Sequence, residues 1–182
     1  MLPWVNLPNL ITFLRLVLVP FIIRAILAGR HELALALFAL AAATDVLDGF
    51  VARSLGLGTR TGAYFDPIAD KFLLSGVFLA LAVARMVPWW LTAIVIGRDV
   101  YLVLGASMIR FSIGAKDFPP SIWGKASTFV QILTVAIWIA RDAFPSSVFN
   151  AAASSTVWPC VAATVWSGLH YTWRGLQFER TH

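Results

Sequence analysis

Hydrophobic residues fill long stretches of the chain, separated by short breaks that contain glycine, proline or charged residues. Six stretches reach the roughly 20 mostly apolar residues that a helix needs to cross a bilayer. They span residues 9–29, 33–53, 62–84, 89–110, 122–140 and 151–171. The pattern predicts an all-α membrane protein folded as a six-transmembrane-helix bundle.

Composition supports a bilayer as the solvent of this bundle. Of 182 residues, 59% are hydrophobic and 13% are charged, and the mean hydropathy is +0.80. The first apolar stretch contains Arg15 and Arg24 and has no small-residue cleavage site, so we expect a retained helix instead of a cleaved signal. No linker or repeat divides the chain, which predicts one membrane domain over residues 1–182.

The charge of the chain also points to lipid. The net charge is +5, but the basic residues are scattered and form no run or aromatic–basic repeat. We therefore expect attraction to anionic lipid headgroups and no nucleic-acid partner. The single cysteine, Cys160, excludes a disulfide or a cysteine metal site within one chain.

Orientation follows from the lysines and arginines near the ends of the spans. With six spans both termini share one side, and that side carries more basic residues: Arg53, Arg60, Arg110, Lys116, Arg174 and Arg180, against Arg30, Arg85 and Arg141. This bias predicts cytoplasmic termini in an inner (plasma) membrane. Tryptophans near the span ends fit an interfacial belt: Trp4, Trp89, Trp90, Trp123, Trp158 and Trp173.

Four aspartates lie where the second apolar stretch ends and the third begins: Asp45, Asp48, Asp66 and Asp70. The first two are three residues apart and the last two are four apart, so each pair shares a helix face. A short loop between the two helices brings all four to one depth on the cytoplasmic side. An isolated carboxylate in a membrane costs about 3 kcal/mol or more, and four of them repel one another.

Nearby positive charge alone does not account for this cluster. Arg15, Arg53 and Lys71 supply three charges, but they do not explain why all four acids are aspartates at helical spacing. Aspartate oxygens suit Mg²⁺ or Mn²⁺, which bind a few carboxylates together with substrate phosphates. Two such ions that clamp a diphosphate are a common arrangement for in-line displacement.

The acids belong to a longer pattern, Asp45-x2-Asp48-Gly49-x2-Ala52-Arg53-x8-Gly62-x3-Asp66-x3-Asp70. This pattern resembles, without a gap, the signature of the CDP-alcohol phosphatidyltransferase family, whose fold is also six transmembrane helices with a cytoplasmic-side site. The resemblance implies that the four aspartates hold two metal ions and that Asp70 also acts as general base. It implies that Gly49, Ala52 and Gly62 line a cytidine pocket and that Arg53 touches the diphosphate.

The implied reaction transfers a phosphatidyl group from CDP-diacylglycerol to an acceptor hydroxyl and releases CMP. At the start of the first stretch, Asn9, Thr12 and Arg15 fall three apart on one helix face. One interpretation is a helix cap with a snorkelling arginine. The resemblance favours the other, in which Asn9 and Thr12 border the CDP-lipid headgroup.

Basic residues of the fourth and fifth stretches are candidates for binding the acceptor's phosphate: Arg98, Arg110 and Lys125. Interfacial snorkelling is the alternative for Arg110 and Lys125. Arg98 and Asp99 are adjacent and point in different directions on a helix. We therefore expect them not to pair with each other and to find partners elsewhere in the bundle.

Two short runs look more like the cardiolipin synthase branch of the family: Arg98-Asp99 and Lys125-x2-Thr128-x2-Gln131. In the phosphatidylglycerophosphate synthase branch we would expect Arg-Glu and a second lysine in place of Ser127. A phosphodiester acceptor carries less negative charge than a phosphomonoester, which fits a neutral Ser127. We therefore expect phosphatidylglycerol as acceptor, with glycerol 3-phosphate as the alternative.

Two more distant functions also use intramembrane aspartates. Intramembrane prenyltransferases generally have more helices and widely separated acidic motifs, whereas both pairs here lie within residues 45–70. A cation transporter would need polar residues through both leaflets, whereas these acids cluster at one end. Members of the resembled family are homodimers, so the resemblance also implies a homodimer.

Overall fold

The computed structural model describes the backbone of residues 7–55, 62–113 and 122–179, and the side chains of residues 13–45, 71–105 and 122–174. The described backbone forms six helices: α1 (Leu7–Leu27), α2 (His31–Leu55), α3 (Gly62–Val83), α4 (Trp89–Ile113), α5 (Ile122–Ala143) and α6 (Ser147–Glu179). The all-α class is confirmed, and each helix corresponds to one predicted stretch. The largest difference is α6, whose 33 residues extend well beyond the predicted 151–171.

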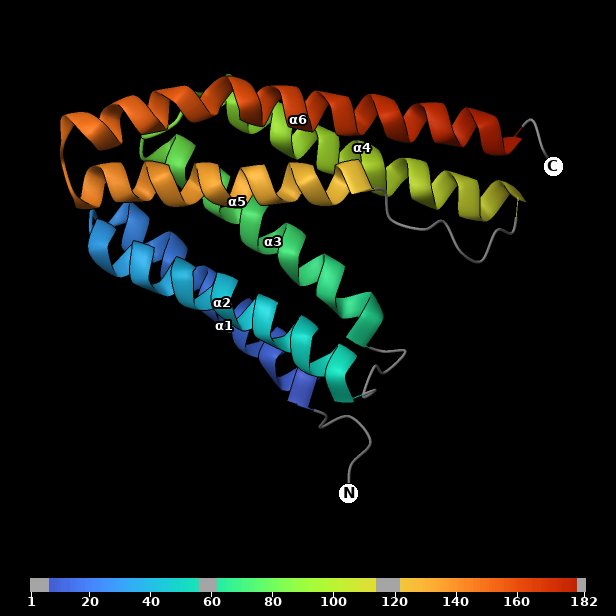
Figure 1. The fold of residues 1–182 in the computed structure, drawn as a ribbon, viewed down its shortest axis with the longest axis horizontal. Helices are drawn as coiled ribbons and strands as arrows, with labels where there is room; N and C mark the ends of the chain where they lie inside the picture. Colours follow the sequence, from blue (N-terminus) through green and yellow to red (C-terminus); the bar gives the residue numbers. More distant parts are fainter. Residues whose placement is uncertain (1–6, 56–61, 114–121, 180–182) are drawn as a thin grey trace.

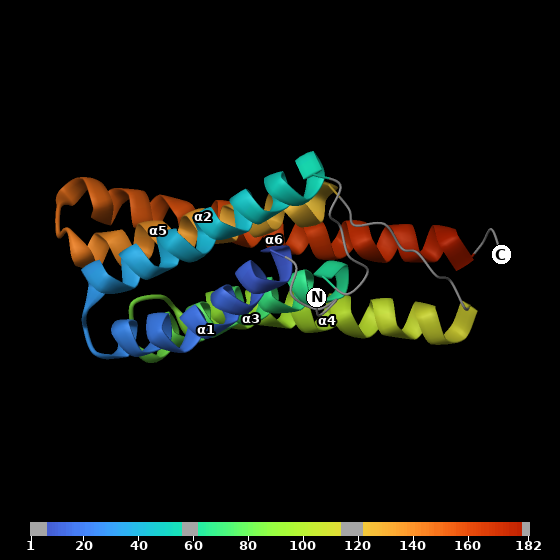
Figure 2. The same cartoon turned by 90° about the horizontal axis from the view of Figure 1, so that it is seen from below.

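Successive helices run in opposite directions, as Figure 1 and the view from below in Figure 2 show. The connections after α1, α3 and α5 lie at one end of the molecule, here called the connected end. The start of α1, the end of α2 and the start of α3 lie toward the other end, here called the open end. This alternation is the topology expected of a chain that crosses a layer repeatedly.

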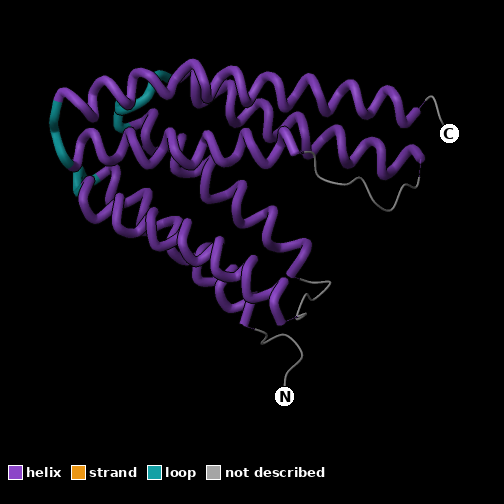
Figure 3. The backbone as a smooth tube through the Cα atoms, in the orientation of Figure 1, coloured by secondary structure: helices purple, strands orange, loops and turns teal. Residues whose placement is uncertain are grey.

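The helices form two groups that meet at the connected end (Figures 1 and 3). In one group α1 packs against both α2 and α3, and in the other α6 packs against α4 and α5. The groups are joined by α3, which also contacts α4, and by contacts of α2 with α5. Toward the open end the two groups diverge, so the helix segments there depend more on individual side-chain contacts for their relative positions.

Glycine and arginine close the helices at the connected end. Gly29 has φ +70° and Arg85 has φ +57°, the left-handed conformation that often ends a helix. In each case the next residue donates its N–H to a carbonyl five residues back, from Arg30 to Ala25 and from Met86 to Leu81. These bonds satisfy the last carbonyls of α1 and α3 and turn the chain back into the bundle.

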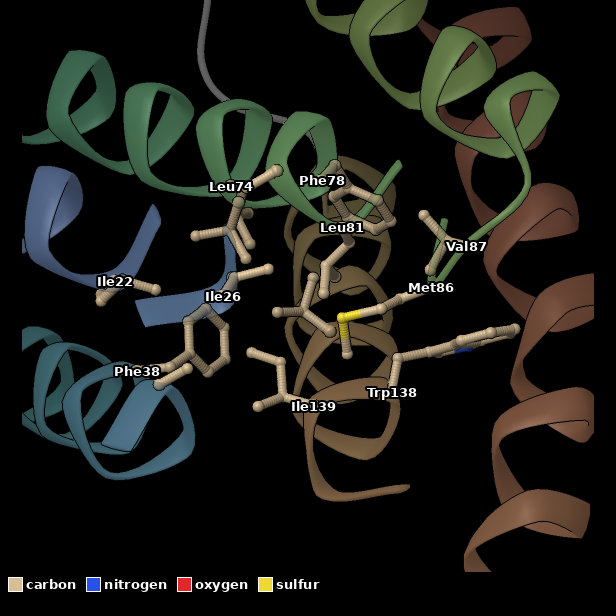
Figure 4. Packing of buried hydrophobic residues seen from close by; sticks show 14 of the residues in the cluster. Ile22, Ile26, Phe38, Leu74, Phe78, Leu81, Met86, Val87, Trp138 and Ile139 are labelled. Carbon is tan, nitrogen blue, oxygen red and sulfur yellow. The ribbon is translucent and has the colours of Figure 1, made fainter. Parts of the chain in front are cut away.

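An apolar core fills the connected end, with side chains from all six helices and the α3–α4 connection, and Figure 4 shows part of it. Its largest fully buried members include Ile22, Ile26, Phe38, Phe78, Leu81 and Ile139. The outward-facing surface is also apolar, with large side chains such as Phe72, Leu104, Phe129 and Trp158 exposed. A protein in water rarely exposes so many large apolar side chains, whereas a lipid-facing surface favours them.

Two helices among the described residues are long and apolar enough to cross a membrane, Ile122–Ala143 and Ser147–Arg174. This is consistent with the predicted membrane protein. The crossing of a bilayer by all six helices stays a prediction.

Candidate active site

Asp45 is the predicted metal ligand whose side chain the structure describes. It lies in α2, and its Oδ1 forms an ion pair with Nη2 of Arg15 in α1, at 2.6 Å. The Arg15 side chain is 1% exposed and the Asp45 side chain is 39% exposed. A buried guanidinium requires an anionic partner. Asp45 therefore neutralises Arg15 and still keeps surface on which a ligand could bind.

The other three acids lie on helix segments near Asp45. Asp48 follows it in α2, and Asp66 and Asp70 lie in the first turns of α3. The end of α2 and the start of α3 both lie at the open end (Figure 1). The side chains of these three acids fall outside the described residues, and the described side chains include no group of three His, Cys, Asp or Glu residues. Their convergence on metal ions stays a prediction.

The residues predicted to bind the CDP-lipid occupy the same end of the molecule, on three helices: Asn9 and Thr12 in α1, Gly49, Ala52 and Arg53 in α2, and Gly62 at the start of α3. Their side chains also lie outside the described part of the chain. The topology thus brings together the segments that carry them, and their contacts stay predictions.

Lys71 directly follows Asp70 and connects α3 to α4. Its Nζ donates a hydrogen bond to the carbonyl oxygen of Asp99 at 3.3 Å. The Asp99 carboxylate attracts the Lys71 ammonium group, and the Arg98 guanidinium repels it. The sequence identified Lys71 as a counter-charge for the acids but gave no sign of this partner on α4.

Arg98 and Asp99 pair with each other, so the expectation that these neighbours would not pair is wrong. Nη1 of Arg98 donates to Oδ1 of Asp99 at 2.8 Å, and each side chain is 8% exposed. Helical spacing describes where Cβ atoms point, but an arginine side chain is long enough to bend back to an adjacent carboxylate. The expected partner elsewhere in the bundle is confirmed, because Nη2 of Arg98 donates to Oγ of Ser167 in α6.

Arg98 lies beside two glycines, one on α5 and one on α6, at distances that would also admit a Cβ. A Cβ on Gly124 would lie 3.6 Å from Nη2 of Arg98, and one on Gly168 would lie 3.9 Å from its Cγ. Lys125, next to Gly124, is exposed. Arg110 lies in α4 with its side chain outside the described residues. Binding of an acceptor by Arg98, Arg110 and Lys125 stays a prediction, and in the described conformation both terminal nitrogens of Arg98 already have protein partners.

Polar side chains also connect α5 to α6. Nε2 of Gln131 donates to Oγ1 of Thr164 at 3.0 Å and lies 3.4 Å from Oγ of Ser127. All three residues are buried. Thr128, predicted on the same face as Gln131, instead donates to the carbonyl of Gly124 in its own helix at 3.1 Å. Gln131 and Thr164 therefore hold two helices together, and Ser127 contacts Gln131 within α5.

A cavity of about 420 Å³ lies between α3 and α4, beside Lys71 and Asp99. Its other lining residues are mostly apolar: Phe72, Ser75, Ile96, Val100, Val103 and Leu104. An apolar cavity with a few polar groups at one place suits a ligand that is largely hydrocarbon and carries a charged group.

A second arginine–aspartate pair between adjacent residues lies at the connected end, away from the acid-bearing segments. Nε of Arg141 donates to Oδ1 of Asp142 at 2.6 Å. The two side chains are 22% and 26% exposed. This pair repeats the adjacent geometry of Arg98 and Asp99 in a more exposed place.

The chain is similar to known proteins over most of its length. The model of the family described as CDP-alcohol phosphatidyltransferase matches residues 5–166. A probable phosphatidylglycerophosphate synthase of Mycobacterium tuberculosis (strain H37Rv) is 35% identical, over 94% of this chain and 82% of that protein.

Two further relatives are named for two different reactions of this family. The CDP-diacylglycerol–glycerol-3-phosphate 3-phosphatidyltransferase of Bacillus subtilis is 31% identical, over 94% of this chain and 97% of its own. The cardiolipin synthase (CMP-forming) of Rattus norvegicus is 34% identical, over 93% of this chain and 62% of its own. The resemblance carried by the aspartate pattern is thereby confirmed, and the chain belongs to the CDP-alcohol phosphatidyltransferase family, enzymes of phospholipid synthesis.

Proposed function

We propose that this enzyme transfers a phosphatidyl group from CDP-diacylglycerol to a glycerol-type acceptor, with phosphatidylglycerol as the favoured acceptor, and releases CMP. The observation that carries the proposal is the placement of the acid-bearing segments of α2 and α3 at one end, with Asp45 held by the buried Arg15. The family membership supplies the donor class.

The proposed cofactors are two divalent cations, Mg²⁺ or Mn²⁺, held by Asp45, Asp48, Asp66 and Asp70. Aspartate oxygens are hard ligands, which such ions prefer. Asp45, the member of the four whose side chain is described, pairs with Arg15 and is still partly exposed, so it could also bind an ion. When bound, the ions would neutralise the diphosphate and stabilise CMP as the leaving group.

The protein's own residues then position and deprotonate the substrates. Asp70 accepts the proton of the acceptor hydroxyl, whose oxygen attacks the phosphorus on the lipid side of the diphosphate. The bond from that phosphorus to the CMP oxygen breaks, and CMP leaves. Arg53 contacts the diphosphate. The small residues at positions 49, 52 and 62 admit cytidine, and Asn9 and Thr12 border the headgroup.

Three features support a phospholipid acceptor. The cavity beside Lys71 is largely apolar and suits an acyl chain. In the described cluster Lys71 and Arg98 carry two positive charges against the one negative charge of Asp99, which favours an anionic ligand nearby. Ser127 is buried and adds no charge for a phosphomonoester. Arg110 and Lys125 are the proposed direct contacts of the acceptor's phosphate.

Glycerol 3-phosphate is the second candidate acceptor. Relatives that match this chain over most of their own length are named for phosphatidylglycerophosphate synthesis. Both reactions release CMP and use the same acids, so they differ in the acceptor alone.

We further propose that all six helices cross the membrane, with the open end facing the cytoplasm, and that two copies form a homodimer. The helices are 21 to 33 residues long. At about 1.5 Å per residue, each can span a hydrocarbon layer of about 30 Å.

The test is an assay of the purified enzyme with CDP-diacylglycerol and Mg²⁺. Phosphatidylglycerol, glycerol 3-phosphate and inositol phosphate are supplied separately, and CMP release and the lipid product are measured. We expect CMP release with phosphatidylglycerol and its loss in EDTA. Release with glycerol 3-phosphate alone would overturn the preferred acceptor, and no release with any hydroxyl acceptor would overturn the proposed function.

A further inference from the structure

The acid-bearing start of α3 lies where the two helix groups diverge (Figure 1). Over its whole length α3 packs more closely against α1 than against α4. Among the described side chains, Lys71 makes the α3–α4 hydrogen bond nearest to the acids. The next, from Thr92 to the carbonyl of Phe78, lies two helical turns further toward the connected end. Lys71 is therefore well placed to set the distance between the acids and α4.

The contact made by Lys71 continues across the bundle. Its Nζ donates to the carbonyl of Asp99, and the carboxylate of Asp99 accepts a hydrogen bond from Nη1 of Arg98. Nη2 of Arg98 donates to Ser167. The Lys71 bond ends on the main chain of α4, and the side chains of Asp99, Arg98 and Ser167 continue from there to α6, so that α3, α4 and α6 are connected at this place. Asp99 and Ser167 are buried, at 6% and 2% exposed, respectively.

Stability alone gives a weak account of this arrangement. Burying an ion pair costs desolvation, and apolar residues of similar volume are often equally or more stabilising. A hydrogen-bonded polar network does fix the relative positions of the groups it joins. The terminal nitrogens of Arg98 are both directed at protein atoms, and its buried Nε has no hydrogen-bond partner among the residues that the structure describes. The guanidinium is thus placed to act on the protein and not on a ligand.

We propose that Arg98, Asp99 and Ser167 form a buried brace that holds Lys71, and with it the turns of α3 that carry Asp66 and Asp70, at a fixed position relative to α4 and α6. This inference rests on the proposed function, in which the acids act on the donor and residues of α4 and α5 bind the acceptor. The three residues are positioning residues that align the two substrates without touching them. This role replaces, for Arg98, the direct acceptor contact expected from the sequence.

The first test removes one hydrogen bond of the brace and leaves its charges in place. Ser167→Ala is compared with Ser155→Ala, whose hydroxyl is exposed and donates to the carbonyl of Ala151 in its own helix. In Ser167→Ala we expect kcat to fall about tenfold, because small misplacements of reacting groups are costly. The KM for CDP-diacylglycerol stays within about twofold. Ser155→Ala keeps the wild-type values.

A second readout does not depend on turnover. Amide hydrogen exchange of peptides that cover the start of α3 reports directly how firmly this segment is held. We expect faster exchange there in Ser167→Ala, although the substitution lies on α6, and unchanged exchange in Ser155→Ala. Ser167→Ala with wild-type kcat and wild-type exchange at α3 would overturn the brace.

A single substitution of Arg98 or Asp99 would leave a buried unpaired charge and could prevent folding, so the second variant replaces both residues. Arg98→Met/Asp99→Leu removes both charges at once and leaves no unpaired ion, and the matched control Arg141→Met/Asp142→Leu removes the pair at the connected end. We expect both to unfold near the wild-type temperature, with kcat reduced about 100-fold only in the first. A rise in acceptor KM alone, with unchanged kcat and exchange, would instead assign Arg98 to acceptor binding. If the wild-type enzyme releases no CMP, the proposed function fails, while the exchange experiment still tests the brace.

Discussion

At the residue scale, two buried arginines reach their carboxylates by different routes. Arg15 crosses from α1 to Asp45 on α2, whereas Arg98 pairs with the next residue of its own helix. In both pairs the guanidinium is almost completely buried, so its charge must be neutralised locally. The first pair therefore couples the position of a proposed metal ligand to α1, and the second couples α4 to α6 through Ser167.

Replacing Arg15 by methionine tests the first pair. Without this cation the proposed acidic cluster loses a neutralising partner, so in EDTA we expect the free energy of unfolding to fall by about 1–3 kcal/mol. Mg²⁺ should then raise the unfolding temperature more than it does in the wild type, because the ions take over the neutralisation. Thermal unfolding with and without Mg²⁺ measures both effects. Arg24→Met, at an exposed position of the same helix, is the control, and an equal Mg²⁺ shift in the two variants would contradict the prediction.

Asp70→Asn tests the proposed general base. The amide keeps the size and an oxygen ligand but cannot accept the proton of the acceptor hydroxyl. We expect turnover to fall at least about 100-fold, within the usual range for loss of a general base, while CDP-diacylglycerol still stabilises the variant against heat. Asp142→Asn, at the connected end, serves as control. Turnover near the wild-type rate in Asp70→Asn would remove Asp70 from this role.

The sequence predicts which helix segments carry the acids, and the structure brings those segments to one end of the molecule, while their role as metal ligands stays a prediction. Spacings of three and four residues place two aspartates on one helix face whatever the neighbours are, so the candidate site needed no tertiary information. The sequence named Arg15 as a counter-charge for the acids, and the structure pairs it with Asp45. Which acid it contacts depends on how α2 packs against α1, and no local pattern encodes that. The pairing of Arg98 with Asp99 depends on side-chain reach and burial, which the rule for helix faces ignores.

At the element scale, α5 and α6 are joined by buried polar side chains in addition to apolar contacts. Gln131 donates to Thr164, and Nε1 of Trp138 donates to Oγ1 of Thr156 at 3.2 Å. Trp138 extends from α5 toward α6 in Figure 4. Between membrane helices, where apolar burial against lipid gives little driving force, such hydrogen bonds contribute on average about 0.6 kcal/mol each.

Gln131→Leu should destabilise the α5–α6 pair by about 1 kcal/mol, because Thr164 and Ser127 lose their buried donor. Adding Thr164→Val should recover most of this loss, since both partners are then apolar. Thermal unfolding of the single and double variants gives the coupling. Thr128→Val, whose hydroxyl bonds within its own helix, is the control. Equal destabilisation by Gln131→Leu and Thr128→Val would show that the bond between the helices contributes nothing.

Helix positions were also predictable, because a run of about 20 apolar residues bounded by glycine, proline or charge has few alternatives. The length of α6 was not. Its first turn begins after Ser146, whose Oγ accepts a hydrogen bond from the N–H of Phe149 at 3.2 Å and so caps the helix before the apolar run begins. A hydropathy pattern detects the apolar run of a helix but not the polar turns that extend it at either end.

At the scale of the whole molecule, the alternating helices place the connected end and the open end on opposite sides of the proposed membrane, with the open end facing the cytoplasm. Cysteine labelling tests this orientation in a Cys160→Ala background, which removes the buried native cysteine. We expect a membrane-impermeant maleimide to label Arg30→Cys and Ser146→Cys, at the connected end, in intact cells. Lys125→Cys, at the start of α5, should react only after the membrane is permeabilised. Labelling of Lys125→Cys in intact cells would reverse the proposed orientation.

The two kinds of ion pair also bear on how the chain is inserted during its synthesis. A lone arginine or aspartate at the centre of an inserting helix costs about 2.5–3.5 kcal/mol. Arg98 and Asp99 lie side by side in sequence, so they can neutralise each other as soon as α4 forms, before any other helix is present. The pair of Arg15 with Asp45 can form only once the next helix, α2, is also present. We therefore expect the translocon to release α1 and α2 as a helical hairpin, whereas α4 can partition into lipid alone.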